Sequence, residues 1–131
     1  MMPAKAPTTN MSLLIVEDDA MFRETFIDAM TLRGVRVESA SSGSEALRTL
    51  QHNRPSVIIL DVQLPDIHGF ELCRCIKRSE RLKDIPVVFL SASTQYNDPR
   101  DRAEGMLSGA SAFLPKPITL EKLWSEISTL V

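Results

Sequence analysis

The feature that most constrains the fold is the alternation of short, wholly apolar runs with longer amphipathic stretches. Continuous apolar runs indicate strands that are buried on both faces of a sheet. Together with two shorter, weaker patterns, they place strands at residues 13–16, 35–37, 57–60, 87–90 and 112–114. Apolar residues at helical spacing, with capping residues ahead of them, place helices near residues 20–33, 42–50, 70–77, 101–108 and 119–130. Five strands that alternate with five helices predict an α/β fold with a parallel sheet and right-handed crossovers.

Length bounds the domain organisation. A chain of 131 residues can bury a core as a single domain without disulfide bonds or a structural metal. No internal repeat, low-complexity segment or interdomain linker interrupts residues 11–131, which we expect to form that domain. Residues 1–10 are polar and contain proline, so we expect a disordered tail there.

Composition argues against several functional classes. The net charge of −2 gives no electrostatic reason to expect direct nucleic-acid binding, and no basic recognition helix is present. No apolar run approaches the roughly 18 residues that a membrane span requires. The start of the chain also lacks the apolar stretch of a signal peptide. We therefore expect a cytoplasmic protein that does not contact membranes.

The two cysteines do not indicate metal or redox chemistry. Cys73 and Cys75 lie two residues apart in an expected helix, so their side chains point to different faces. A zinc site requires four ligands, and His52 and His68 do not stand at a metal-binding spacing from them. Both cysteines are interpreted as small core or half-buried residues.

Side chains able to carry out phosphoryl chemistry follow four of the expected strands. They are Glu17, Asp18 and Asp19 after the first strand, Asp61 after the third, Ser91 after the fourth and Lys116 after the fifth. Ligands of such sheets bind beyond the carboxyl ends of the strands, so these side chains should meet. Clustered carboxylates repel one another, and a hard cation such as Mg²⁺ relieves that repulsion. A carboxylate can also attack phosphorus, while an ammonium and a hydroxyl can bind phosphoryl oxygens.

Each of these residues also has an ordinary structural interpretation. Asp18 or Asp19 is expected to cap the helix that follows, whatever else it does. Asp61 taken alone could begin a turn, because Leu-Pro-Asp follows at residues 64–66. Lys116 taken alone is more often a solvated charge than a ligand. Their joint occurrence at the ends of four buried strands favours a functional site.

Four motifs carry a resemblance to a known family. They are Ile-Val-Glu-Asp-Asp at residues 15–19, residues 59–66 leading to Gly69, Leu-Ser-Ala at residues 90–92, and residues 109–117 with Lys116 between two prolines. In this order they resemble the receiver domain of bacterial two-component response regulators, over residues 11–131. The resemblance implies a flavodoxin-like, doubly wound sheet with strand order 2-1-3-4-5 and a phosphorylation-dependent signalling switch.

The resemblance also implies a role for each matching residue. Asp61 would accept the phosphoryl group from a phosphohistidine of a sensor histidine kinase or phosphotransfer protein. Asp18 and Asp61 would bind Mg²⁺ (or Mn²⁺) directly, Glu17 through water, and Gln63 through its backbone carbonyl.

Further implied roles concern the switch. Lys116 would pair with Asp61 or its phosphoryl oxygen, and the Lys116–Pro117 peptide bond would be cis. Ser91 would turn its hydroxyl onto the phosphoryl group, and Phe113 would follow as the aromatic switch residue. Together they would alter a surface made by the fourth helix, fifth strand and fifth helix, which controls a protein partner or an output domain.

Three departures from the family pattern are visible. Residues 93–99 predict a polar loop about three residues longer than is usual, which bears on the output surface. Ser91 stands where threonine is more common and keeps the hydroxyl. Phe113 stands where tyrosine is more common, so its movement would break no hydrogen bond.

Two other functions are weighed against the switch. A phosphatase of the haloacid dehalogenase type also forms an aspartyl phosphate, but it needs a second Asp as general acid where this chain has Gln63. A flavin carrier with the same sheet would need a Gly-rich phosphate loop, whereas the acids at residues 17–19 repel phosphate. The sequence leaves open whether the receiver is free-standing or part of a DNA-binding regulator or hybrid kinase, and whether it forms a homodimer. Trp124, on the margin of the last helix, is read as either core or interface.

Overall fold

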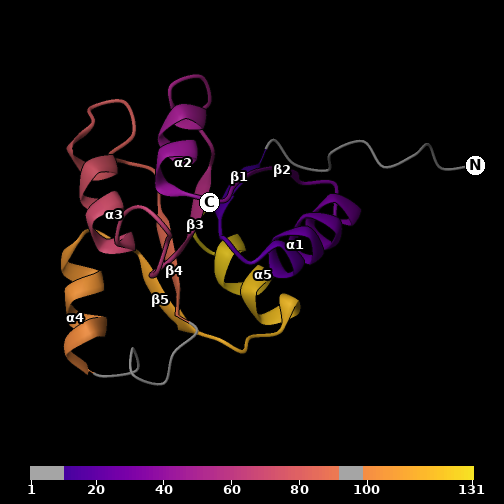
Figure 1. Cartoon of the computed structure of the whole chain (residues 1–131). Helices are drawn as coiled ribbons and strands as arrows, with labels where there is room; N and C mark the ends of the chain where they lie inside the picture. The colour runs from indigo at the N-terminus through magenta and orange to yellow at the C-terminus, as the bar shows by residue number, and fades with distance from the viewer. Residues whose placement is uncertain (1–10, 92–98) are drawn as a thin grey trace, which may run out of the picture.

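The computed structural model describes residues 11–91 and 99–131 and shows a five-stranded parallel sheet with helices on both faces (Figure 1). The strands are β1 (Ser12–Val16), β2 (Arg36–Ala40), β3 (Val57–Asp61), β4 (Val87–Ser91) and β5 (Ala112–Pro115). The helices are α1 (Ala20–Leu32), α2 (Gly43–Leu50), α3 (Gly69–Arg78), α4 (Pro99–Leu107) and α5 (Leu120–Ser128). The strand order is β2-β1-β3-β4-β5. The doubly wound α/β fold with order 2-1-3-4-5 is thus confirmed.

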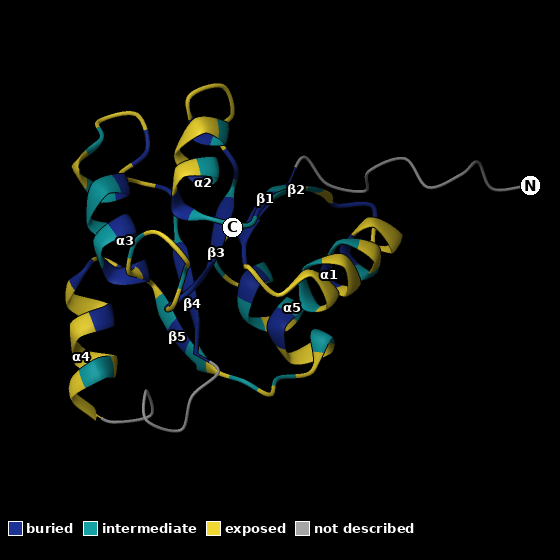
Figure 2. Ribbon diagram, in the orientation of Figure 1, coloured by how far each residue is buried: buried dark blue, intermediate teal, exposed yellow. Residues whose placement is uncertain are grey.

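Each face of the sheet has its own apolar core, because alternate residues of a strand point to opposite faces. Phe26 of α1 and Ile127 of α5 pack on the face that includes Ile15 of β1. Leu50 of α2 and Leu72 of α3 pack on the other face. Figure 2 shows buried residues along the strands and on the helix sides that face them. Every residue of β3 and β4 is buried, which explains why their sequences are almost wholly apolar.

The helix ends follow the expected capping chemistry, except that Glu45 bonds to a different residue. Asp19, not Asp18, caps α1: its Oδ1 accepts the Met21 N–H at 3.0 Å. Ser42 caps α2 by accepting the Glu45 N–H at 3.2 Å. The Glu45 carboxylate turns to Ser41 instead of completing the capping box on Ser42, because Ser41 offers both an N–H and a hydroxyl donor, at 3.3 and 2.9 Å.

The fourth helix begins earlier than the sequence pattern suggested. Its first residue is Pro99, which the sequence placed in the lengthened loop. Proline suits the first turn of a helix, since its missing N–H would have no intrahelical partner there. The rest of that expected loop, and the expected tail at residues 1–10, lie outside the described residues.

The cysteines and Trp124 lie at the margins of the core or within it. Cys73 is buried with its Sγ 3.5 Å from the Ser108 carbonyl oxygen, and Cys75 is half-buried, as expected of structural cysteines. Trp124 is half-buried against the core between α1 and α5, and the Arg33 guanidinium lies 5.4 Å from its ring centroid. Within the described ranges, none of the helices is long and apolar enough to span a membrane.

Candidate functional site

The parallel register brings the strand-end residues to one edge of the sheet. Asp61 closes β3 opposite Leu90 of β4, and Ser91 closes β4 opposite Pro115 of β5. Glu17 and Asp18 follow β1, whose last residue lies opposite Leu60 of β3, and Lys116 follows β5. The backbone itself ties two of these strand ends together, because the Lys116 N–H donates to the Ser91 carbonyl at 2.7 Å.

Three carboxylates form the centre of the site. Glu17, Asp18 and Asp61 each offer an oxygen that lies within 4.8 Å of the others. Glu17 is 1% exposed and Asp61 8% exposed, whereas Asp18 is open to solvent. Gln63 adjoins the cluster through its N–H, which donates to Asp61 Oδ1 at 3.3 Å. Oxygen ligands with one solvent-open position fit Mg²⁺, which retains water ligands in protein sites.

The electrostatics of the cluster separate its two buried acids. Burial, then the hydrogen bond and negative charge of Glu17, raise the pKa of Asp61 from 3.8 to about 7. Burial also opposes ionisation of Glu17. Its hydrogen bonds to Asp61, Lys116 and the Asp19 N–H outweigh that effect, so the pKa of Glu17 lies below its ordinary value. Near neutral pH, Glu17 therefore carries the charge and Asp61 is poised to bind or release a proton.

Lys116 has a partner other than the one the family resemblance suggested. Its ammonium forms an ion pair with Glu17 rather than with Asp61. The hydrogen bond and positive charge of Lys116 favour the ionised form of Glu17 and so contribute to its lowered pKa. Lys116 Nζ also lies 4.5 Å from the ring centroid of Phe22, a distance at which a cation interacts with an aromatic face.

Ser91 presents an unpaired hydroxyl at the same edge. The residue is 1% exposed, and its Oγ has no hydrogen-bond partner among the residues that the structure describes. A buried hydroxyl without a partner is unfavourable and calls for an explanation such as a ligand. Its position at the end of β4 makes it available to a group bound on the carboxylate cluster.

Phe113 is buried in an aromatic cluster between β5 and the helices α3 and α4. Its ring centroid lies 6.0 Å from that of Phe89 and 6.3 Å from that of Phe70. The Arg102 guanidinium of α4 lies 5.9 Å from the Phe113 ring, and a Cβ on Gly105 would come within 2.8 Å of it. The ring of the residue expected to act as a switch is thus buried. The Lys116–Pro117 bond is cis, as expected.

Contacts that the sequence did not reveal complete the site. Arg23 Nη1 of α1 donates to the Glu17 carbonyl at 2.6 Å, and Phe22 lies beneath the Lys116 ammonium. Both are helix residues whose spacing indicated only a helical face. No local sequence pattern reports the contact of Phe22 with Lys116 at the far end of the chain, so that contact emerges only from the fold.

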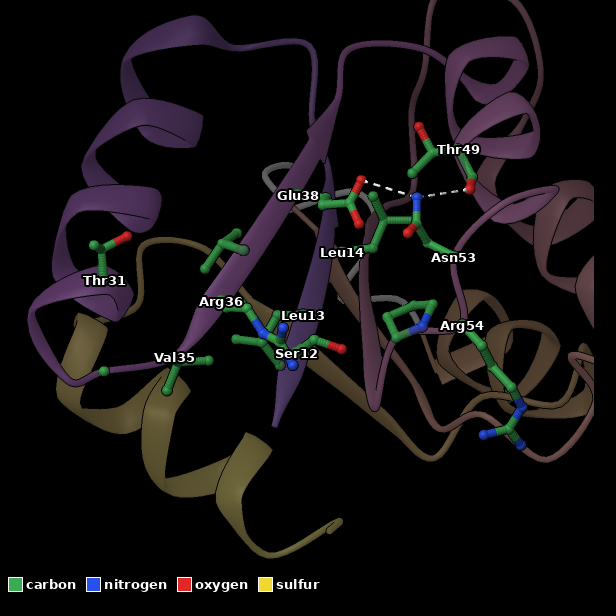
Figure 3. Close-up of a pocket in the computed structure, with 13 residues that line it drawn as sticks. Ser12, Leu13, Leu14, Thr31, Val35, Arg36, Glu38, Thr49, Asn53 and Arg54 are labelled. Atoms are coloured by element: carbon green, nitrogen blue, oxygen red, sulfur yellow. Dashed lines mark hydrogen bonds between the residues drawn. The ribbon is translucent and has the colours of Figure 1, made fainter. Parts of the chain in front are cut away.

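An open cavity of about 530 Å³ adjoins the cluster. It is lined by Asp18, Gln63, Leu64, Pro65, Asp66, Ile67 and His68. A second cavity, of about 540 Å³, lies beside the amino ends of β1 and β2 (Figure 3). At this cavity the Asn53 amide donates to the Glu38 carboxylate and to the Thr49 carbonyl. None of the expected site residues lines this second cavity. Only the first lies at the sheet edge where parallel sheets bind ligands.

The fold and the site together match one protein class. The family model of the response regulator receiver domain matches residues 13–128. The chain belongs to the response regulator receiver domain family. This membership favours the signalling switch over the phosphatase and the flavin carrier.

Individual relatives support the same assignment. The transcriptional regulatory protein AfsQ1 of Streptomyces coelicolor is 42% identical over 107 residues, covering 82% of this chain and 45% of AfsQ1. The response regulator MprA of Mycobacterium leprae is 35% identical over 121 residues, covering 92% of this chain and 51% of MprA. The chain thus spans about half the length of these relatives. The chemotaxis response regulator CheY4 of Vibrio cholerae superposes with a TM-score of 0.86 at 31% identity, covering 94% of this chain and 100% of that structure.

Proposed function

We propose that residues 11–131 form a receiver domain in which Asp61 accepts a phosphoryl group from a phosphohistidine of a sensor histidine kinase or phosphotransfer protein. The observation that carries this proposal is the clustering of Glu17, Asp18 and Asp61 at the carboxyl edge of the sheet. The Lys116 ammonium at the same edge supports it, as does family membership. So does the buried Ser91 hydroxyl, which has no hydrogen-bond partner among the described residues.

The transfer requires Asp61 to act as a nucleophile. A carboxylate oxygen forms a bond to phosphorus, the phosphorus–nitrogen bond of the donor breaks, and its electron pair returns to the imidazole nitrogen. Asp18 and Asp61 would hold Mg²⁺ (or Mn²⁺) directly, Glu17 through water and Gln63 through its carbonyl. The bound cation would supply positive charge against the carboxylates and the phosphoryl oxygens.

Lys116 and Ser91 complete the proposal. The Lys116 ammonium, held by Glu17 in this structure, would turn to a phosphoryl oxygen once the phosphoryl group brings additional negative charge. The Ser91 hydroxyl, which has no partner within residues 11–91 and 99–131, would donate to another phosphoryl oxygen. Neither step requires a new element to fold.

The output of the switch is proposed to be a protein contact. Phe113 would follow Ser91 and alter the surface of α4, β5 and α5, where Met106 and Leu107 are 45% and 86% exposed. Apolar side chains in contact with water suit a protein partner, an output domain or a second copy of the chain rather than nucleic acid. Slow self-dephosphorylation in the cytoplasm completes the proposed cycle, since Gln63 supplies no general acid to speed hydrolysis.

Intact-mass spectrometry tests the central step. The protein is incubated with acetyl phosphate and Mg²⁺, and the wild type is compared with Asp61→Asn. We expect the mass of one phosphoryl group on the wild type only. Asp28→Asn, an equivalent change at an exposed position of α1, should gain the phosphoryl group like the wild type. A wild type that gains no mass, or an Asp61→Asn variant that gains it equally, would refute the proposal.

A further inference from the structure

Asp66 lies in the loop between Asp61 and α3, where the sequence indicated only a turn. Its carboxylate reaches across to α2: Oδ1 accepts the Gly43 N–H at 2.8 Å and Oδ2 accepts the Ser44 N–H at 2.9 Å. These are the first two residues of the helix. A carboxylate at a helix amino end makes charge-assisted bonds and opposes the positive end of the helix dipole. The two N–H donors lower the pKa of the Asp66 carboxyl below its ordinary value.

This link is accompanied by close packing. A Cβ placed on Gly43 would come within 2.1 Å of Ile67 Cγ2 and 3.2 Å of Asp66 Oδ1. The loop tip and the amino end of α2 are therefore in direct contact, and a side chain at position 43 would require Ile67 to move. Ser42 separately caps the same helix through the Glu45 N–H. The bonds from Asp66 are thus an addition to the helix's own cap.

The base of the loop is fixed at the carboxylate cluster. The Gly69 N–H donates to the Val62 carbonyl at 2.7 Å, and Gln63 forms a β-bridge with His68. The Gln63 N–H reaches Asp61 Oδ1 at 3.3 Å. The loop is therefore held at its base, where Gln63 lies beside the site, and at its tip by α2.

We infer that Asp66 is a positioning residue, whose bonds to the amino end of α2 hold the loop so that Gln63 faces the metal site and thereby set the affinity for Mg²⁺. The inference rests on the proposed function, in which Gln63 offers its carbonyl to the cation. A backbone ligand cannot turn toward a metal by changing a side-chain rotamer, so its position depends on the loop. Leu64 and Ile67 of that loop pack against the core, whereas Gln63 itself is exposed. The attachments at the base and tip of the loop therefore contribute to its conformation around Gln63.

Coupling between the Asp66 link and Mg²⁺ binding acts in both directions. If the link raises the affinity for Mg²⁺, bound Mg²⁺ must strengthen the link by the same factor. The amide hydrogens of Gly43 and Ser44 should therefore exchange more slowly when Mg²⁺ is present. This effect should vanish in a variant whose residue 66 cannot accept both bonds.

Calorimetric titration with Mg²⁺ tests the inference on the whole chain. Asp66→Asn replaces one acceptor by an amide donor, so residue 66 can accept only one of the two N–H bonds. We expect the Kd for Mg²⁺ to rise on the order of 5-fold, as for weakly coupled sites. Ser42→Ala is the matched control, because it weakens the same helix end without touching the loop. Its Kd should stay at the wild-type value. Amide exchange, with and without Mg²⁺, should show protection at Gly43 and Ser44 in the wild type and not in Asp66→Asn.

The outcomes separate this inference from the proposed function. A wild type that binds no Mg²⁺ would refute both. A wild type that binds Mg²⁺ with an Asp66→Asn variant of equal affinity would refute only the role of Asp66. Equal losses in Asp66→Asn and Ser42→Ala would assign the effect to helix stability. A loss that disappears in 1 M salt, where the Debye length is about 3 Å, would assign it to the charge of Asp66 alone.

Discussion

Replacing Asp61 by asparagine should stabilise the metal-free protein at pH 8 and do so much less at pH 5. Burial and the neighbouring Glu17 raise the pKa of Asp61 from 3.8 to about 7 in the folded state. The folded protein therefore holds the Asp61 proton more tightly than the unfolded chain does. The stability that this proton contributes is complete below pH 3.8 and is lost as the pH rises through about 7.

The magnitude follows from the size of the pKa shift. Each pKa unit corresponds to about 1.4 kcal/mol, so an ionised Asp61 costs roughly 4 kcal/mol at pH 8. At pH 5 the same calculation gives roughly 2 kcal/mol, because the folded protein keeps its proton and only the unfolded chain ionises. Asparagine is nearly isosteric, carries no charge and can still donate a hydrogen bond to Glu17. The stability difference between variant and wild type should therefore grow by about 2 to 3 kcal/mol from pH 5 to pH 8.

Urea unfolding in the presence of EDTA, at several pH values between 5 and 8, measures this difference. The exposed Asp28 of α1 provides the control, since Asp28→Asn makes the same chemical change away from the buried cluster. That variant should show only a small change in the free energy of unfolding. A stability difference for Asp61→Asn that does not grow with pH would contradict the assignment of a raised pKa to Asp61.

Three other substitutions test separate parts of the structure. Asp19→Ala should lower the free energy of unfolding by about 1 kcal/mol in urea titrations, because α1 loses its cap. Gly105→Ala should also destabilise, by about 1 kcal/mol, because the new Cβ would lie 2.8 Å from Phe113 Cδ2. Ser91→Ala should remain folded but take up phosphoryl groups from acetyl phosphate more slowly in a mass-spectrometric time course.

Each of these predictions has its own contrary result. Asp19→Ser keeps a capping oxygen and should retain most of the stability. Equal losses of unfolding free energy in Asp19→Ser and Asp19→Ala would show that the cap does not stabilise α1. An increase in stability for Gly105→Ala, of the size usual for Gly-to-Ala changes inside helices, would show that Phe113 does not press against α4. Ser91→Thr keeps the hydroxyl and should be phosphorylated faster than Ser91→Ala. Equal phosphorylation rates in the two variants would show that the hydroxyl plays no part in the transfer.

The sequence by itself determined the order of the elements and the place of the site. Fully apolar runs such as residues 57–60 indicated strands covered on both faces, and the helical stretches between them favoured parallel crossovers. Parallel strands bring their carboxyl ends to one edge, so the positions of Glu17, Asp18 and Asp61 in the chain were enough to predict that they meet. The structure places their oxygens within 4.8 Å of one another.

Only the tertiary structure decided how these groups are paired. Lys116 joins Glu17 rather than Asp61, and Asp61 acquires its raised pKa from burial and from Glu17. Asp66, an ordinary turn residue in the sequence, bonds to the amino end of α2. Local periodicity records which face of an element is buried but not which distant group lies opposite. Partner choice and desolvation depend on distances between segments far apart in the chain, and these exist only once the sheet and its loops have formed.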